Sequence, residues 1–186
     1  MTRYKTILVD PPWPYSQTLG RGKKFGDTTG GGLPYKSLTL EQIKSLPING
    51  LADKDCMLFL WTTNSFIHEA FHVVEAWHFT YKTMVTWGKT QIGLGYWLRG
   101  QTEHFLLAVK GNPRTKMTGP HGTTGSSWST LIIDKRTAHS EKPQVFSDMI
   151  EEKSEPPRIE LFARRQRMGW DVWGNEVYSS INLEEL

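Results

Sequence analysis

Short apolar runs alternate along the chain with polar and glycine-rich stretches, and their spacing predicts the secondary structure. Apolar runs of strand length that end at turn residues indicate buried or half-buried strands. The expected strands are Thr6–Val9, Cys56–Trp61, Thr83–Trp87, His104–Val109, Thr130–Ile133, Arg158–Phe162 and the short edge strand Trp170–Trp173. The second of these is apolar throughout, which is typical of a buried parallel strand.

Three of the intervening stretches have helical features. Thr39–Gln42 has the capping-box pattern and opens a short helix to about Leu46. Ser65–His78 places its apolar residues on one helical face, and Pro143 suits the first position of a helix to about Glu152. Strands that alternate with helices predict an α/β fold with a three-layer, mostly parallel sheet. The fourth and fifth expected strands have no helix between them, which predicts one antiparallel pair.

Length and composition agree with one domain, because the chain has 186 residues, of which 38% are hydrophobic and 22% charged. No apolar run approaches the roughly 18 residues of a membrane span, and no secretory segment precedes Thr6. We therefore expect a cytoplasmic protein that does not bind membranes. The single cysteine, Cys56, excludes an internal disulfide. A net charge of +3 permits a polyanionic partner, and eight tryptophans offer many rings for stacking on bases.

The first expected strand stops at Asp10-Pro11-Pro12-Trp13. Open α/β sheets bind ligands at the carboxyl ends of their strands. Here Asp10 and the Pro11 carbonyl could accept the two hydrogens of an exocyclic amino group, while the prolines add no competing N–H. These acceptors suit the amino group of adenine. The alternative is a turn at a strand end with Trp13 in the core, and the tetrapeptide alone leaves both open.

A polar, glycine-rich stretch, Ser16–Tyr35, follows this tetrapeptide. Loops of this length inside a compact domain are usually functional or disordered, so we expect a mobile lid over the strand end. Asn112–Ser129 and Asp134–Glu141 are expected to be the next most mobile stretches.

Two other motifs compete with this interpretation. His68-Glu69-Ala70-Phe71-His72 matches the zinc-protease pattern H-E-x-x-H, and His78 stands where one group of such enzymes has its third ligand. Glu75 replaces the glycine that would turn the chain back, so a continuing helix would carry His78 away from the other two. We therefore expect a solvated helix face and no metal. Gly88-Lys89-Thr90 lacks the earlier glycine of a phosphate-binding loop, because that position is Thr83.

A series of ordered motifs resembles the DPPW-type family of adenine-N6 methyltransferases, which includes the catalytic subunit of the eukaryotic messenger-RNA adenosine methyltransferase. The resemblance spans roughly residues 7–176 and implies a small bacterial or phage member. The motifs are Asp10–Trp13, Leu33–Tyr35, Phe59–Trp61, Trp87–Thr90, Val109–Pro113, Lys142–Pro143 and Ile159–Arg164.

This resemblance implies a Rossmann-like domain that uses S-adenosylmethionine, with the catalytic strand early and the cofactor strand late in the chain. Asp10 would meet both the target amino group and the methionine end of the cofactor. Lys142 would bind the cofactor carboxylate, and a helix N-terminus beside it agrees with an anion site. The other expected cofactor residues are Glu160, Arg164, Gln166, Arg167, Asn175 and Glu176. The expected substrate residues are Trp13, Tyr35, Trp87 and Lys89.

The chain departs from the animal enzyme of that family at several positions. Gln166 and Arg167 stand where that enzyme has His and Asn near the ribose, and Glu176 stands where it has Gln. The chain also starts shortly before its first strand, so we expect the C-terminal tail to complete the adenine pocket of the cofactor, or part of that pocket to be missing.

Nucleic acid is the expected partner, and compactness without an RNA-binding domain favours DNA over RNA. Basic residues on loops at one end of the sheet would contact phosphates. They are Lys23, Lys24, Arg114, Lys116, Lys135, Arg136 and the cluster Arg164–Arg167. The alternatives are an RNA adenosine methyltransferase and a non-catalytic nucleic-acid-binding module with a degenerate methyltransferase fold. Target selection would come from this domain or from another protein, and the expected protein partners are a second copy in a homodimer or another protein.

Overall fold

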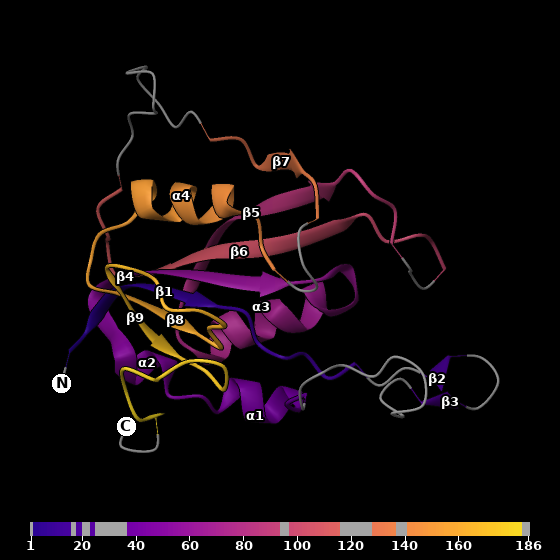
Figure 1. Ribbon diagram of the computed structural model, residues 1–186. Helices are drawn as coiled ribbons and strands as arrows, with labels where there is room; N and C mark the ends of the chain where they lie inside the picture. The colour runs from indigo at the N-terminus through magenta and orange to yellow at the C-terminus, as the bar shows by residue number, and fades with distance from the viewer. Residues whose placement is uncertain are drawn as a thin grey trace.

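The computed structural model describes residues 2–15, 37–93, 97–115, 128–136 and 141–183, and the backbone of two short strands near residue 20. A seven-stranded sheet forms its centre (Figure 1). Its strands are Tyr4–Val9 (β1), Ala52–Thr62 (β4), Thr80–Lys89 (β5), Thr102–Lys110 (β6), Leu131–Asp134 (β7), Arg158–Leu161 (β8) and Trp170–Trp173 (β9). Thr18–Leu19 (β2) and Lys23–Lys24 (β3) pair only with each other. Every predicted strand is confirmed, and β9 lies at an edge of the sheet as expected. The rest of the predicted lid lies outside the described residues.

The helices are Leu40–Lys44 (α1), Ile48–Leu51 (α2), Ile67–Ala76 (α3) and Gln144–Lys153 (α4), with a 3₁₀ turn, Asn64–Phe66 (η1), before α3. The capping box of α1 is confirmed: the Thr39 hydroxyl accepts from the Gln42 N–H, and the Gln42 side chain accepts from the Thr39 N–H. Pro143 is the N-cap of α4 and not its first residue. The short helix α2 was not predicted, because a four-residue turn carries almost no periodicity. Among these described helices, none has the length and apolar character needed to span a bilayer.

The strand order is β7-β5-β6-β4-β1-β8-β9. Six strands run in one direction, and β6 is antiparallel to both of its neighbours, β4 and β5. The mostly parallel sheet with one antiparallel strand is therefore confirmed. The expected pairing between the fourth and fifth strands, His104–Val109 and Thr130–Ile133, is wrong, because β5 lies between β6 and β7 and pairs with both. The short connection between β5 and β6 allows them to pair, and the longer one after β6 carries the chain past β5.

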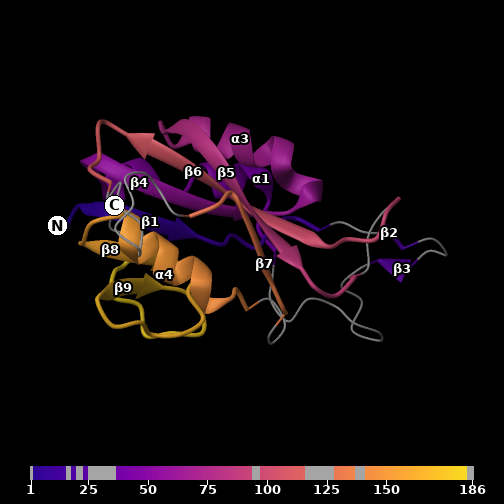
Figure 2. The same cartoon turned by 90° about the horizontal axis from the view of Figure 1, so that it is seen from above.

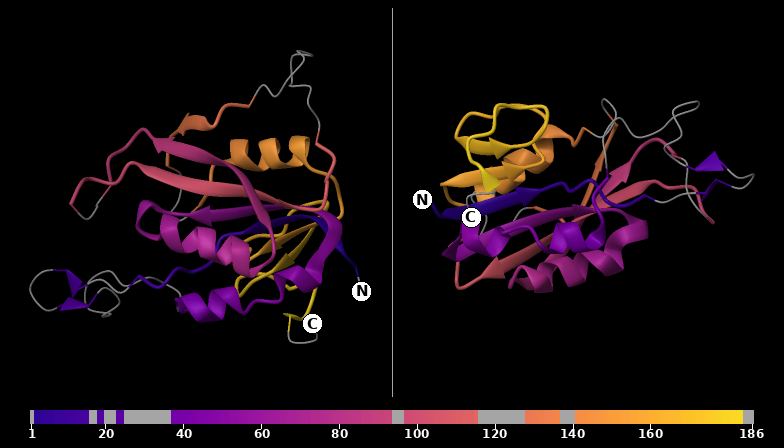
Figure 3. Two further views of the ribbon diagram at one scale, coloured as in Figure 1. Left: turned by 180° about the vertical axis from the view of Figure 1, so that it is seen from behind. Right: turned by 90° about the horizontal axis from the view of Figure 1, so that it is seen from below.

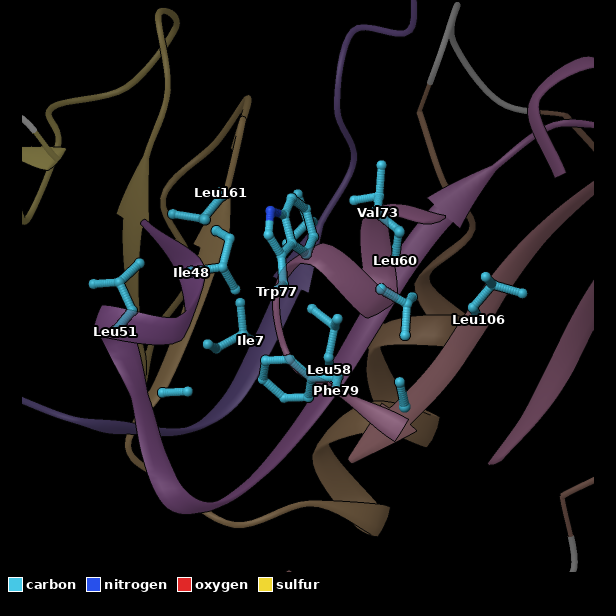
Figure 4. Close-up of a cluster of buried hydrophobic side chains, with 14 of the residues drawn as sticks. Ile7, Ile48, Leu51, Leu58, Leu60, Val73, Trp77, Phe79, Leu106 and Leu161 are labelled. Carbon is cyan, nitrogen blue, oxygen red and sulfur yellow. The ribbon is translucent and has the colours of Figure 1, made fainter. Parts of the chain in front are cut away.

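Helices cover both faces of the sheet. Helix α4 packs on one face, and α1, α2 and α3 pack on the other (Figures 1, 2 and 3). Side chains alternate along each strand, so Ile7 and Val9 enter the core under α1–α3, whereas Leu8 enters the core under α4. The first core surrounds the Trp77 indole, whose N–H donates to a backbone carbonyl of α1 at 3.2 Å (Figure 4). Both faces of β1 are thus buried, which fixes its carboxyl end.

That end of β1 is the point at which the sheet changes direction. From β1 the chain passes through α1 and α2 to β4 on one side, and it later returns through α4 to β8 on the other side. Because the two connections lie on opposite faces, the carboxyl end of β1 is the switch point of the strand order, which is where open α/β sheets hold their ligands.

Candidate active site

The backbone of Asp10-Pro11-Pro12-Trp13 is tied down directly after β1. The Pro12 carbonyl accepts from the Leu38 N–H at 2.9 Å, and the Pro11 carbonyl accepts from the Trp13 N–H at 2.9 Å. A carbonyl oxygen has two lone pairs, so the Pro11 carbonyl keeps capacity for one more donor. The turn therefore presents Asp10 and the Pro11 carbonyl from a fixed backbone.

Trp13 supports this turn from inside the core. Its side chain is 3% exposed, its indole N–H donates to the Trp61 carbonyl at 3.0 Å, and its ring stacks on Phe66 with centroids 5.5 Å apart. This is the structural alternative that the sequence left open for Trp13. Stacking of Trp13 on a substrate base stays a prediction that requires part of the core to open.

Four charged side chains from four segments meet beyond the end of β1. Lys142 Nζ, just before α4, is 2.7 Å from Asp10 Oδ2 and 3.4 Å from Glu103 Oε2 on β6. The other Glu103 oxygen accepts from Lys89, at the end of β5. We name Asp10, Lys142, Glu103 and Lys89 the acceptor cluster. Two carboxylates and two ammonium groups make it neutral overall.

Burial and mutual contact set the protonation of the acceptor cluster. Burial raises the pKa of Asp10 above its ordinary value, against the opposing effect of Lys142. Burial would lower the pKa of Lys142, but Asp10 and Glu103 outweigh it and raise that pKa. Burial alone would raise the pKa of Glu103, yet Lys142 and Lys89 hold it below its ordinary value. Glu103 therefore stays ionised and is a stable counter-ion of Lys142. Of the two carboxylates, Asp10 has the greater tendency to bind a proton.

Aromatic rings line the cluster from the α4 side of the sheet. Lys142 Nζ lies 5.1 Å from the centroid of the Trp61 ring, and Lys89 Nζ lies 4.8 Å from that of Trp87. Trp87 is only 3% exposed, and its indole N–H donates to the Asp134 carbonyl. Trp87 thus shapes the surroundings of Lys89 from within the core, and direct contact of either residue with substrate stays a prediction. Tyr35 lies outside the described residues.

A second group of charged side chains lies on the other side of β1, at the end of β8. Arg167 stands between two carboxylates, 3.8 Å from Glu160 and 3.8 Å from Glu151 of α4. Its guanidinium lies 5.5 Å from the Trp170 ring, whose N–H donates to Glu151 at 2.8 Å. We name Glu160, Arg167 and Glu151 the open cluster.

Buried atoms of the open cluster retain unused hydrogen-bonding capacity. Within the described residues, Glu160 Oε2 and Arg167 Nη1 are buried without a hydrogen-bond partner. Burial raises the pKa of Glu160, against the opposing effect of Arg167. An acceptor and a donor left open side by side suit the vicinal hydroxyls of a ribose.

The remaining expected cofactor residues lie around the loop after β8. Arg164 pairs with Glu176 at 2.9 Å, and the Gln166 side chain donates to the carbonyl of Tyr178 at 2.8 Å. Asn175 is exposed and follows a glycine that brings two segments into close contact. A Cβ atom on that glycine, Gly174, would lie 2.4 Å from the carbonyl oxygen of the loop residue at position 163. Only glycine permits this approach, which sets residues 175–176 beside the loop after β8.

The two clusters together fit S-adenosylmethionine. Lys142 uses two of its three donors on Asp10 and Glu103, so one is left for an anion such as a carboxylate. No side chain caps the N-terminus of α4, which begins two residues after Lys142. The residues present would therefore hold the amino-acid end of the cofactor near Lys142 and its ribose near Glu160.

The rival histidine motif does not form a comparable cluster. His68 and His72 lie on the exposed side of α3 with their Nε2 atoms 3.3 Å apart. The helix ends at Ala76, and His78 follows it with a positive φ of 62°. Across the described part of the chain, no group of three or more His, Cys, Asp or Glu residues is arranged to hold a metal ion.

Glu103 is the member of the acceptor cluster that sequence reasoning missed. It stands directly before the predicted strand 104–109, and strand alternation gives it the same face as Phe105 under α4. The available signal was a carboxylate just before a predicted strand, two positions ahead of the buried Phe105. Its counter-ions are distant in sequence, so the signal alone did not reveal its partners.

The fold and the two clusters agree with a methyltransferase that uses S-adenosylmethionine. The chain belongs to the MT-A70 family, whose model matches residues 4–176. This bears out the resemblance to adenine-N6 methyltransferases and the expected cofactor.

Similar proteins come from bacteria and from animals. The chain is 32% identical over 189 residues to the type II methyltransferase M.MunI of Mycoplasma sp, across 94% of this chain and 78% of that protein. It is 28% identical over 186 residues to the human N(6)-adenosine-methyltransferase catalytic subunit METTL3, across 94% of this chain. That match covers 28% of METTL3. The chain is also 26% identical to a Drosophila melanogaster MT-A70-like protein, and this match covers 27% of the Drosophila protein.

Proposed function

We propose that this protein transfers a methyl group from S-adenosylmethionine to the N6 amino group of adenine in DNA. The observation that carries the proposal is the 2.7 Å contact between Lys142 and Asp10 at the end of β1. It places the expected cofactor anchor and the expected amine acceptor in one hydrogen-bonded unit, although 132 positions separate them in sequence.

The chemistry requires the adenine amine to become more nucleophilic. Its lone pair is delocalised into the ring, so acceptors for both of its hydrogens favour a pyramidal nitrogen. Asp10 Oδ and the Pro11 carbonyl supply these acceptors from a fixed turn. When bound, S-adenosylmethionine supplies an electrophilic methyl group.

Lys142 and Glu103 keep Asp10 in the required state. Lys142 holds Asp10 in position and favours the ionised carboxylate, which is an acceptor only. Glu103 retains Lys142 if the Asp10 oxygen turns toward an amine, so no buried ammonium is left without a counter-ion. As the amine loses a proton during transfer, the raised pKa of Asp10 makes this carboxylate a suitable acceptor.

Similarity supports DNA as the polymer, and surface charge supports a polyanion of either kind. The similarity to a type II methyltransferase extends over most of both chains, whereas only about a quarter of METTL3 is matched. Lys135 and Arg136 follow β7 at the carboxyl end of the parallel strands and can contact phosphates of either polymer. The expectation that Arg114 lies at the same end is wrong, because Arg114 follows the antiparallel strand β6 and lies near Asp53 and Asp55 at the start of β4.

Methyl-transfer assays on DNA and RNA oligonucleotides of matched sequence, single- and double-stranded, test this proposal. We expect N6-methyldeoxyadenosine in digests of the DNA, with several-fold less N6-methyladenosine from the RNA. A stronger RNA product would favour the RNA methyltransferase. A product methylated on another base would contradict the adenine assignment. The absence of both methyl transfer and cofactor binding would favour the non-catalytic module.

A further inference from the structure

The loop between β5 and β6 presents large apolar side chains to solvent. Trp97 is 100% exposed and Leu98 is 84% exposed, whereas Trp13, Trp61 and Trp87 are buried. A fully exposed indole keeps apolar area in contact with water, which costs free energy. Exposed apolar patches usually mark a binding surface.

The stem of this loop is well bonded even though its apolar side chains are exposed. Lys89 and Gln101 face each other across the stem, with the Lys89 N–H donating to the Gln101 carbonyl at 2.8 Å. The Gly93 N–H donates to the Gly100 carbonyl at 2.7 Å, and the Arg99 side chain donates to the Gly93 carbonyl at 2.8 Å. Trp97 is therefore carried on a closed stem.

The stem leads directly into the acceptor cluster. Its two strands reach Lys89 and Glu103, which pair with each other, and Glu103 also pairs with Lys142. In Figure 1 the loop projects beyond the end of the sheet, where β1 and β4 also end. Trp97 thus lies on a hairpin whose base adjoins the site that would receive a target base.

The charge around this hairpin is positive. In the described residues 89–93, 97–103 and 134–136, the charged side chains are Lys89, Arg99, Glu103, Asp134, Lys135 and Arg136. Glu103 is engaged with Lys89 and Lys142, and Asp134 accepts from the Lys135 N–H. Arg99 and the two cations after β7 therefore dominate the outer surface, which complements a polyanion.

We propose that Trp97 is a wedge that enters the base stack of duplex DNA when the target adenine is flipped into the site. The inference rests on the proposed function. Extrusion of a base leaves a gap and breaks its stacking, at a cost of a few kcal/mol. An indole delivered on a closed stem fills the gap with a flat apolar surface, while Arg99 lies within the same loop to meet a phosphate.

The wedge predicts a difference between duplex and single-stranded substrates. The substrates are a long PCR-amplified duplex and the single strand left after exonuclease removes its complement. Trp97→Ala should lower kcat/KM on the duplex by about 10- to 100-fold and change it less than about threefold on the single strand. Trp97→Phe should recover most of the duplex activity, because phenylalanine also fills the gap. Tyr81→Ala, a control that removes a side chain 40% exposed near the start of β5, at the other end of the sheet, should change neither substrate's value.

Binding to a duplex with a stable abasic site gives a readout that does not depend on turnover. Wild type should bind this duplex more tightly than the intact one, and Trp97→Ala should lose the preference. Equal losses of kcat/KM on both substrates, or an unchanged preference for the abasic duplex, would overturn the wedge while leaving adenine methylation intact. Absence of methyl transfer by wild type on both substrates would contradict the proposed function itself.

Sedimentation distinguishes a protein contact from a DNA contact at the same residue. If wild type is a dimer that Trp97→Ala dissociates, Trp97 belongs to an interface between copies and the wedge is wrong. The wedge requires that the substitution leave the sedimentation coefficient of the free protein unchanged.

Discussion

The acceptor cluster and the open cluster lie on opposite sides of β1, and both contain carboxylates and cations. In the acceptor cluster, Lys142 reaches Asp10 at 2.7 Å and Glu103 at 3.4 Å. In the open cluster, Arg167 stays 3.8 Å from both of its carboxylates. Within the described chain, the first is joined by direct hydrogen bonds, and the second keeps a buried donor and a buried acceptor unused.

The difference shows that the acceptor cluster is already bonded, and it supports our proposal that a ligand completes the open cluster. A buried polar group without a hydrogen bond costs free energy, and a ligand that supplies the bond recovers it. The open cluster therefore gains from binding, whereas the acceptor cluster holds its geometry before binding. For a weakly nucleophilic amine, fixed acceptors reduce the reorganisation needed during transfer.

The largest expected effect is that of Asp10→Asn on activity. The amide has one acceptor oxygen and an NH₂ group that would face the substrate's NH₂, so methyl transfer should fall by at least about 10³-fold. The free energy of unfolding should change by less than about 1 kcal/mol, because burial already disfavours the charged carboxylate and Lys142 retains Glu103. Single-turnover transfer and urea denaturation measure the two effects. Activity near that of wild type would remove Asp10 from the mechanism.

Lys142→Met and Arg167→Met compare the two clusters directly. Lys142→Met leaves Asp10 and Glu103 close together without their shared cation, so the free energy of unfolding should fall by about 2–3 kcal/mol. Arg167→Met removes longer contacts without hydrogen bonds and should cost less than about 1.5 kcal/mol. Denaturant titrations at pH 7.5 give both values. Equal losses of unfolding free energy in the two variants would show that the shorter distances of the acceptor cluster add no stability over those of the open cluster.

Glu160→Gln tests whether the open cluster binds the cofactor. Affinity for S-adenosylmethionine should fall by about 10- to 100-fold in calorimetry, equivalent to about 1.4–2.7 kcal/mol. The free protein should be as stable as wild type or slightly more so, because the pKa of Glu160 is raised by burial. Glu151→Ala is the comparison variant, since it removes the acceptor of the Trp170 indole N–H and should affect stability more than cofactor affinity. If the Glu160 variant lost stability and the Glu151 variant lost cofactor affinity, the cofactor would not bind at Glu160.

The smallest effect concerns His104, which neighbours Glu103 but faces the opposite side of the sheet. His104 Nδ1 is 3.0 Å from the Thr86 hydroxyl, its Nε2 contacts Asn64, and burial lowers its pKa. Below the ordinary histidine pKa of about 6.5, the unfolded chain binds a proton more readily than the folded one, so stability decreases as pH falls. This slope is at most about 1.4 kcal/mol per pH unit and should disappear in His104→Gln. Urea titrations from pH 7.5 to 5 measure it, and an unchanged slope in the variant would assign it to other groups.

The elements were predictable from sequence because their apolar periodicity is local. β1, β4 and α3 are buried on defined faces, and each follows its pattern closely. The position of β5 between β6 and β7 was not predictable in the same way, because strand order depends on where connections travel in space.

The site was predictable only in part for a similar reason. Asp10 and Lys142 follow from motifs, but the motifs do not state that the two side chains bond to each other. Trp13 shows the second difficulty. An indole at a strand end serves equally as a stacking surface or as core, and only the packing against Phe66 separates these roles.

The separation of Asp10 from Lys142 also sets the order in which the site can form during synthesis. At about 5–20 residues per second, the 132 positions between them correspond to roughly 7–26 s of translation. During that time β1 can pair with β4, but β8 has not emerged and the other edge of β1 stays open. A nascent chain paused before β8 would expose that edge of β1 to strands of other chains, so pairing between chains would be favoured at that stage.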